Sequence, residues 1–150
     1  MRVLLQRVSE ASVTIDHQKT AEIGKGLLLL VGITHTDTKA IVEAVAQKVA
    51  GLRIFEDAQG KMNLDLKDVQ GSILSVSQFT LYADYRKGRR PGFEPAAKPP
   101  LASDLYDYFN QILKNEYEVQ TGVFGADMKV QLINDGPVTI LIDSEELSHG

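Results

Sequence analysis

Two short segments contain residue types that could carry out chemistry, and the first is Ser77-Gln78-Phe79-Thr80. Two hydroxyls, an amide and an aromatic ring stand together where an apolar run ends. Backbone N–H groups at the end of a strand can donate to an oxyanion. A polar strand end that only satisfies its own backbone would have the same composition. The residues alone leave both interpretations open.

The second segment is Asn134-Asp135-Gly136-Pro137-Val138-Thr139. Asn, Asp and Gly tolerate positive φ and Pro stiffens the chain, so a hairpin turn is one interpretation. A proline directly after glycine also suits a cis peptide bond, which is rare and rigid. Rigid Gly-Pro backbone could present carbonyl oxygens to a ligand with no side chain in the way.

The sequence lacks the usual side-chain machinery of an enzyme. It has no cysteine, which excludes thiol nucleophiles, disulfides and Cys-ligated zinc. His17, His35 and His149 have no partner at metal-ligand spacing. There is no G-x-S-x-G elbow, P-loop or G-x-G-x-x-G motif, and the acidic residues are scattered. We therefore expect neither a metal nor a cofactor.

Charge and hydropathy limit the partners. The formal net charge is −4, so a polyanion such as RNA must bind at a local basic patch. The longest apolar run, residues 27–31, is far too short to span a bilayer. The N-terminal segment does not read as a signal peptide, so we expect a cytoplasmic protein without membrane association. The obvious basic patch is Arg86, Lys87, Arg89 and Arg90.

Strands are expected to outnumber helices. A helix capped by Thr36 or Asp37 should carry an apolar stripe and end at Gly51, and a second should follow Pro99-Pro100. We therefore predict one α+β domain over residues 1–150, with a mostly antiparallel, barrel-like sheet and two main helices. The expected strands are two within residues 3–15 with a break near Ser9-Glu10, then residues 27–33, 52–55, 72–77, 128–133 and 138–142.

Both segments resemble signatures of the D-aminoacyl-tRNA deacylase family, also called D-tyrosyl-tRNA deacylases. Residues 77–80 match its Ser-Gln-Phe-Thr motif, and residues 134–139 match its Asn-x-Gly-Pro-Val-Thr motif. The sequence departs from the family pattern at Gly92, where serine is common, and residues 143–150 match no motif. Further matches follow in order along nearly the whole chain: residues 6–8, 11–13, 53–55, 60–63, 90–91, Phe93, 105–109, 120–122, Phe124 and 126–128.

The resemblance implies an enzyme that hydrolyses the ester between a D-amino acid and its tRNA, and that also accepts glycyl-tRNA. It implies a homodimer with active sites at the interface, where Gly136-Pro137 of one subunit enters the pocket of the other. The carbonyls of this pair would hold the substrate's amino group, and an L side chain would collide with them. Arg7 is expected to brace the pair, and Met62 and Phe124 are expected to contact the substrate.

The resemblance also assigns catalytic roles. An aminoacyl ester is already activated by the neighbouring ribose hydroxyl, so positioning and oxyanion stabilisation are the main requirements. We expect the backbone N–H groups of Phe79 and Thr80 to stabilise the oxyanion. Ser77 and Gln78 should shape the pocket floor and bind the terminal adenosine or the ester. A nucleophilic Thr80 ranks lower, because no base stands near it in the sequence. The basic patch should contact tRNA phosphates.

Two competing hypotheses come from other functional classes. A non-catalytic RNA-binding module would use aromatic and basic residues together, such as Tyr82, Tyr85 and Arg86. A structural interaction domain would use Gly136-Pro137 only as a turn. The sequence leaves open which D-amino acids and tRNAs are preferred.

Overall fold

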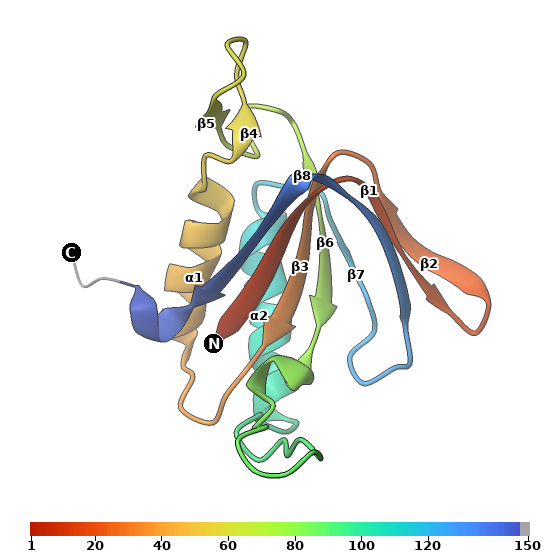
Figure 1. Cartoon of the computed structure of the whole chain (residues 1–150), viewed down its shortest axis with the longest axis vertical. Coiled ribbons are helices and arrows are strands. Elements are labelled where there is room, and N and C mark those ends of the chain that lie inside the picture. Colours follow the sequence, from red (N-terminus) through yellow and green to blue (C-terminus); the bar gives the residue numbers. More distant parts are fainter. Residues whose placement is uncertain (148–150) are drawn as a thin grey trace.

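A mixed sheet, which curls until it nearly closes into a barrel, forms the centre of the molecule (Figure 1). The computed structural model describes residues 1–147, and six strands within them run in the order β2-β1-β3-β6-β7 with β8 beside β1. β1 pairs antiparallel with β2, β3 and β8, whereas β3–β6 and β6–β7 are parallel. The predicted α+β class is confirmed. The strands are β1 Arg2–Ile15, β2 Gln18–Ile23, β3 Gly26–Gly32, β6 Ser72–Ser77, β7 Val119–Thr121 and β8 Lys129–Asp143.

The first strand, β1, is continuous over 14 residues, so the expected break near Ser9-Glu10 was wrong. Its first half pairs with β3 as far as Val8, and its second half pairs with β2 from Ala11 onward. Ser9 and Glu10 are exposed at the point where the partner strand changes. The polar pair therefore marks a change of neighbour along one edge of an unbroken strand.

The last strand, β8, corrects a second expectation, because one strand replaces the two predicted around residues 134–137. Between Gln6 and Val8, β1 advances by two residues, while β8 advances by five between Thr139 and Asn134. The extra residues form a bulge, which is the usual way for one strand to exceed its partner in length. The interpretation of this segment as a hairpin turn was therefore wrong.

The side chain of Asn134 closes the bulge. Its Oδ1 accepts from the Val138 N–H at 2.8 Å, and its Nδ2 donates to the Val138 carbonyl at 3.2 Å and to Thr139 Oγ1 at 3.0 Å. An Asn side chain carries both donors and an acceptor, so it can satisfy backbone groups that the interrupted ladder leaves free.

Two helices, α1 Lys39–Gly51 and α2 Leu101–Lys114, cover one face of the sheet (Figure 1). The second begins directly after Pro99-Pro100, as predicted. The first is capped by Thr38, whose side chain accepts from the Ile41 N–H at 3.3 Å, so the expected cap at Thr36 or Asp37 was wrong. Asp37 is not available as a cap because its carboxylate binds the N-terminal ammonium group.

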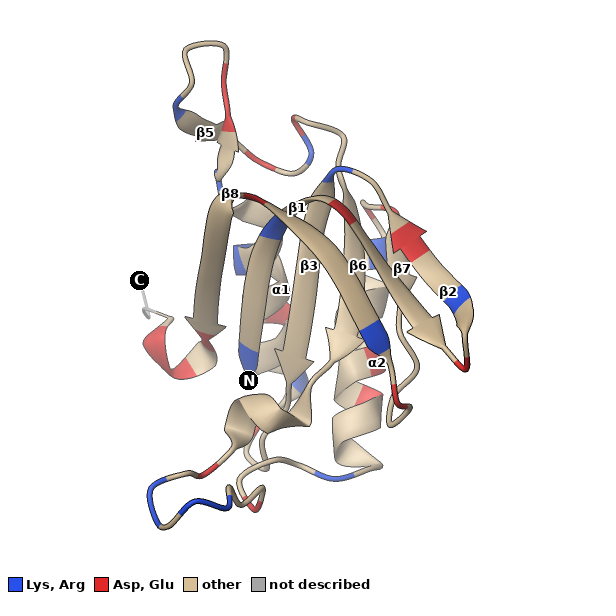
Figure 2. Ribbon diagram, turned by 45° about the vertical axis from the view of Figure 1, so that its right-hand side comes forward, with Lys and Arg blue, Asp and Glu red and all other residues tan. Residues whose placement is uncertain are grey.

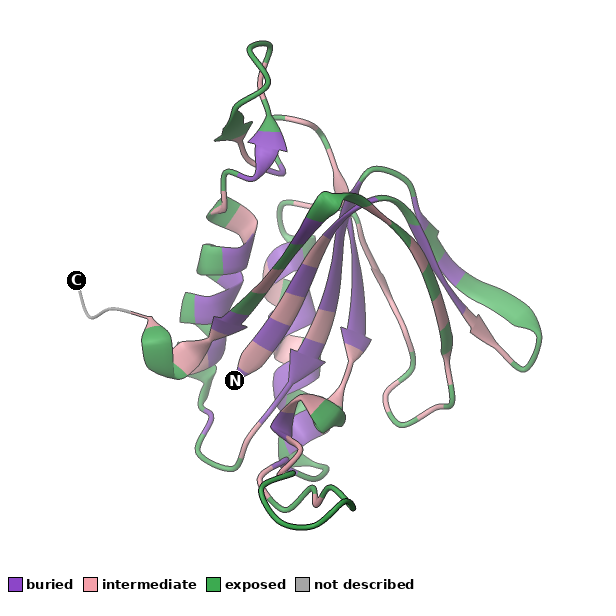
Figure 3. Cartoon of the chain, viewed as in Figure 1, coloured by how far each residue is buried: buried purple, intermediate pink, exposed green. Residues whose placement is uncertain are grey.

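Alternating strand residues build two apolar clusters, one on each face of the sheet. Leu27 and Leu29 of β3 face the helices, whereas Leu28 packs on the other side with Val8 and Val13. Figure 3 shows that β3 and β6 are largely buried, as the continuous apolar runs predicted. The second cluster exists because β2 and β8 curl over the face that the helices leave open.

Several short elements were missed or misplaced. The strand expected at residues 52–55 is reduced to β4 Phe55–Glu56, which pairs with β5 Met62–Leu64 in a projecting hairpin (Figure 1). β2 and β7 are short and carry few buried residues, so their periodic signal is weak. Two single turns of 3-10 helix, η1 Phe79–Tyr82 and η2 Ser144–Glu146, complete the chain.

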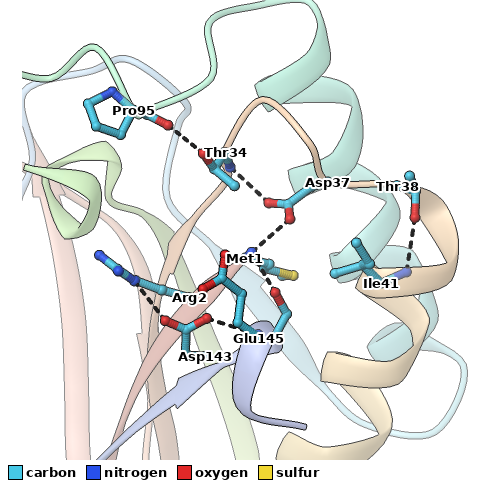
Figure 4. A network of polar contacts seen from close by, with 10 residues as sticks. Met1, Arg2, Thr34, Asp37, Thr38, Ile41, Pro95, Asp143 and Glu145 are labelled. Atoms are coloured by element: carbon cyan, nitrogen blue, oxygen red, sulfur yellow. Dashed lines mark hydrogen bonds and ion pairs between the residues drawn. The ribbon is translucent and has the colours of Figure 1, made fainter. Parts of the chain in front are cut away.

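A buried ion pair ties the start of β1 to the loop after β3 (Figure 4). The Met1 ammonium group lies 2.7 Å from Asp37 Oδ1 and donates to Ser144 Oγ at 2.9 Å. The other carboxylate oxygen of Asp37 accepts from the Thr34 N–H at 2.8 Å. The side chains of Met1 and Asp37 are 0% and 2% exposed, so little water screens the pair.

We expect Asp37→Ala to lower the free energy of unfolding by about 3–5 kcal/mol, because it leaves a buried charge without its partner. Urea unfolding would measure the change. The control is Glu22→Ala, which removes the exposed Lys19–Glu22 pair and should shift stability by less than about 1 kcal/mol. Equal shifts for the two variants would contradict a structural role for the buried pair.

Candidate functional site

A cavity of about 280 Å³ opens at the carboxyl end of β6. It lies between β6, the start of η1, helix α2 and the loop that joins β7 to β8. It brings together four of the predicted site residues, Ser77, Gln78, Phe79 and Phe124. The complete lining is Val31, Ile33, Ser77, Gln78, Phe79, Ala97, Ala102, Tyr106, Phe124, Gly125, Ala126, Asp127 and Met128.

Sequence reasoning missed Tyr106, which forms part of the cavity wall. Its hydroxyl donates to the Ser75 carbonyl at 2.8 Å, and its ring lies 6.2 Å from that of Phe124. Burial raises the pKa of Tyr106, so the phenol stays protonated and keeps its donor at neutral pH. A tyrosine in the apolar stripe of α2 was the available signal, since a buried hydroxyl needs a partner. Met128 and Asp127, also missed, are further lining residues of the cavity.

The end of β6 turns directly into η1. The Gln78 N–H donates to the Val31 carbonyl at 2.7 Å, which fixes the strand end against β3. Phe79 and Thr80 are the first two residues of η1, and the first N–H groups of a helix have no partner within it. Thr80 Oγ1 accepts from Gln78 Nε2 at 2.6 Å. An amide is not a base, so this contact does not activate the Thr80 hydroxyl.

The Gly136-Pro137 peptide bond is cis, a conformation that suits a proline directly after glycine. Arg7 donates from Nε to the Asp135 carbonyl at 2.8 Å, which confirms the expected contact with this segment. It also donates from Nη1 to the Ile54 carbonyl at 2.7 Å, and the residue is only 6% exposed. Arg7 therefore joins the bulge of β8 to the base of the β4–β5 hairpin.

Only glycine fits at position 136. Its φ is +149°, where side chains are rarely tolerated. A Cβ there would lie 2.9 Å from the Val138 nitrogen and 3.1 Å from Arg7 Nη2. Gly136 and Pro137 are themselves exposed, so their backbone is open to a ligand or a second molecule.

One chain does not bring Gly136-Pro137 to the cavity. The bulge lies opposite Arg7, which pairs with Leu27 of β3, which in turn pairs with Ile73 of β6. Ser77 stands four residues further along β6, about 13 Å away along the strand and three strand spacings, about 14 Å, across the sheet. Met62 is also outside the cavity lining; it lies on β5 and is 54% exposed.

The predicted basic patch forms an exposed loop, residues 84–92, which projects from the end of the molecule beyond η1 (Figure 2). Asp84 and Gly92 close its neck with two backbone hydrogen bonds of 2.7 and 2.8 Å. Just after the neck, the ring of Phe93 meets that of Phe79 edge-on, with the centroids 5.1 Å apart. The loop is therefore packed against the residue that begins η1.

Arg86 is already paired within this loop. Its Nε and Nη2 bind the two carboxylate oxygens of Asp84, each at 2.8 Å. These hydrogen bonds lower the pKa of Asp84 to about 2, so the pair is fully charged at neutral pH. Within residues 1–147 no ion pair involves the other three basic residues of the patch, Lys87, Arg89 and Arg90.

Two further findings concern metals and membranes. Among the described residues, no three His, Asp or Glu side chains lie close enough together to hold a metal ion. His35 Nε2 contacts the Glu94 carbonyl at 2.7 Å, and His149 lies outside the described residues. No helix in residues 1–147 is both long and apolar enough to cross a bilayer.

The sequence model of one family, described as D-Tyr-tRNA(Tyr) deacylase, matches residues 4–143. The chain belongs to this family. The expected resemblance is thereby confirmed, and with it the class of enzyme, a hydrolase of D-aminoacyl-tRNA. The hypotheses of a non-catalytic RNA-binding module and of a structural domain lose their basis. The match includes both motifs, residues 77–80 and 134–139, on which the resemblance rested.

Two solved structures are similar to this chain over nearly its whole length. The chain is 39% identical to a protein named c-Myc DNA Unwinding Element Binding Protein, with a TM-score of 0.90, over 95% of this chain and 98% of the other. A probable eukaryotic D-amino acid tRNA deacylase is 17% identical, with a TM-score of 0.82 over 94% and 97% of the two chains. This second likeness concerns the fold alone.

Proposed function

We propose that this deacylase cleaves D-aminoacyl-tRNA at a site that two copies of the chain build together. The observation that carries the proposal is the separation within one chain of the cavity and the braced Gly136-Pro137 bulge. The cavity holds Ser77, Gln78 and Phe79, while the exposed bulge lies roughly four strand residues and three strands away. A second copy can supply the bulge to the cavity if the interface is two-fold symmetric.

Apolar surface next to the bulge supports this arrangement. Ile133 and Leu141 of β8 lie on either side of it, and each is 53% exposed. Large apolar side chains gathered around an exposed functional segment are typical of a surface that another protein covers. The bulge is also held firmly by Arg7 and Asn134, so it can enter a neighbouring pocket without first becoming ordered.

The cavity suits the terminal nucleoside of the substrate. Its volume of about 280 Å³ is just below the usual range of about 300–1,000 Å³ for small-ligand sites, and its walls combine aromatic and apolar side chains with a few polar groups. Tyr106 and Phe124 offer ring surfaces to an adenine base, while Ser77 and Gln78 offer polar atoms to the ribose or the ester. The ester would then lie at the mouth of the cavity, beside the start of η1.

Catalysis in this proposal depends on backbone donors. The N–H groups of Phe79 and Thr80 stand at the start of η1. They would donate to the oxyanion that forms when water attacks the ester. The neighbouring ribose hydroxyl activates the ester, so positioning supplies much of the remaining rate enhancement. A nucleophilic Thr80 is disfavoured by its hydrogen bond from Gln78, which supplies no base.

Stereospecificity follows from the rigidity of the bulge. The carbonyl oxygens beside Gly136 and Pro137 would accept hydrogen bonds from the substrate's ammonium group. An L side chain would then point into this backbone, whereas a D side chain points away, so the wrong enantiomer is rejected by collision. Glycine has no side chain and should pass the same filter. Because aminoacyl-tRNA is made and used with the translation machinery, we place the enzyme in the cytoplasm.

Hydrolysis of D-Tyr-tRNA and L-Tyr-tRNA by the native protein and by Thr80→Ala tests these roles directly. Both proteins should release D-tyrosine, leave L-Tyr-tRNA intact and keep their activity after exhaustive chelation. The variant keeps the backbone N–H, so its rate should stay within about tenfold of native, a loss of about 1.4 kcal/mol in transition-state stabilisation. A folded but inactive Thr80→Ala, or a trapped acyl-Thr80 adduct, would favour the nucleophile instead.

Mixed dimers test whether the site is shared. Phe79→Pro removes one proposed N–H donor. Gly136→Ala places a Cβ on the bulge, where it should block the approach of the substrate. Each variant alone should therefore be nearly inactive. Co-expression of both, with different tags, should restore about a quarter of native activity, because half of the dimers would contain one intact site. Mixtures of each variant with itself are the control. No recovery in purified heterodimers would place the whole site within one chain.

The exposed part of the basic loop should contact tRNA phosphates. Lys87→Gln combined with Arg89→Gln should weaken tRNA binding and flatten its dependence on salt by about one to two units of log–log slope. The control is Lys19→Gln with Lys129→Gln, which removes two exposed charges elsewhere. Binding measured from low to moderate salt would distinguish the pairs, and an unchanged slope for the loop variant would show that the loop faces away from the tRNA.

A further inference from the structure

A second cleft, of about 270 Å³, lies at the end of η1, whereas the cavity lies at its start. It is formed by the basic loop, by the start of β1 and by the segment after the loop. Its lining is Arg2, Tyr82, Ala83, Asp84, Tyr85, Arg86 and Pro95. No step of the proposed reaction uses it.

Aromatic and cationic groups meet in this cleft. Tyr85 is 79% exposed, which is unusual for a side chain with so large an apolar ring. The guanidinium group of Arg2 stands over the Tyr82 ring, 4.5 Å from its centroid. Arg2 is itself oriented by Asp143 at 3.0 Å (Figure 4). It also donates to the Leu81 carbonyl at 2.9 Å. Tyr82 is buried, so Tyr85 presents the exposed ring of the cleft. An exposed ring near an ordered guanidinium group is a surface on which an unpaired base can stack.

The cleft is close enough to the cavity to serve one continuous strand. Phe79 lines the cavity and Tyr82 lines the cleft, and the two are the first and last residues of η1. Three residues of 3-10 helix rise about 6 Å. One nucleotide of a stretched single strand covers a comparable length.

Charge also favours a nucleic-acid occupant. The same loop that supplies Tyr85 and Arg86 carries Lys87, Arg89 and Arg90, on a protein whose net charge is −4. A free apolar peptide would gain little from this concentration of positive charge, whereas a polyanion would be drawn to it.

We propose that the cleft lined by Tyr85, Arg2 and Tyr82 is a subsite for the unpaired nucleotides that precede the terminal nucleoside of the substrate. The proposal rests on the proposed function, because it extends the same strand out of the cavity. Tyr85 stacks on a base, and Arg2 contributes its guanidinium plane or a phosphate contact. The subsite binds unpaired nucleotides without selecting among the bases, because every base has a ring face that can stack.

Two substrates that share one ester separate this subsite from the catalytic cavity. D-Tyr-tRNA occupies both, whereas D-tyrosyl-adenosine, the same ester on the terminal nucleoside alone, reaches only the cavity. Tyr85→Ala should raise KM for D-Tyr-tRNA about tenfold at unchanged kcat, consistent with the loss of one stacked base. Its kinetics on D-tyrosyl-adenosine should equal those of the native enzyme. Tyr85→Phe keeps the ring and should behave as native on both substrates.

A competitor provides a second measurement. The trinucleotide CCA should inhibit the native enzyme more strongly than adenosine does, and Tyr85→Ala should abolish that difference. The salt dependence of tRNA binding should stay native in Tyr85→Ala, because the ring carries no charge. An equal loss on both substrates, or no loss on D-Tyr-tRNA, would overturn the subsite. If the native enzyme hydrolyses neither substrate, the proposed function is refuted instead.

Discussion

The pairing of β1 along both of its edges is the constraint on which the rest of the structure depends. On one edge β1 is followed first by β3 and then by β2, and on the other edge by β8 over almost its full length. Backbone N–H and C=O groups in a buried strand need hydrogen-bond partners, so both edges of β1 must be paired. β8 contains more residues than the ladder can hold, and the surplus is expelled as the bulge at Gly136-Pro137.

Arg7 holds the extra residues of β8 in one conformation, so that the bulge presents a defined surface. It stands on β1 opposite the bulge, and its buried guanidinium donates to the carbonyls of Asp135 and Ile54. Hydrogen bonds from a charged donor are stronger than neutral ones, and their fixed fork sets the direction of both carbonyls. One side chain therefore fixes the strand, the bulge and the β4–β5 hairpin relative to one another. The cavity at the other end of the sheet is built independently, from β6, η1 and α2.

Much of the fold could be predicted because its signals are local. A continuous apolar run predicts β3, and the stripe of Val42, Val45 and Val49 predicts α1. Each pattern is complete within a short stretch of sequence. The continuity of β8 could not be predicted, since Asn-Asp-Gly-Pro has the local chemistry of a turn and only pairing with β1 overrides it. The cap of α1 was misplaced because Asp37 binds an ammonium group 36 residues away. Tyr106 was missed because its spacing is that of a core residue.

The bulge of β8 has a further consequence for how the molecule behaves in solution. In the described chain β8 pairs with β1 alone, so its other edge exposes a row of backbone donors and acceptors. A long, flat edge of this kind invites strands of other molecules to add to it, which leads to fibrous aggregation. Pro137 has no N–H to offer, and the bulge around it breaks the edge into two short pieces that are out of register with each other. The irregularity thus also protects the protein against indiscriminate strand addition.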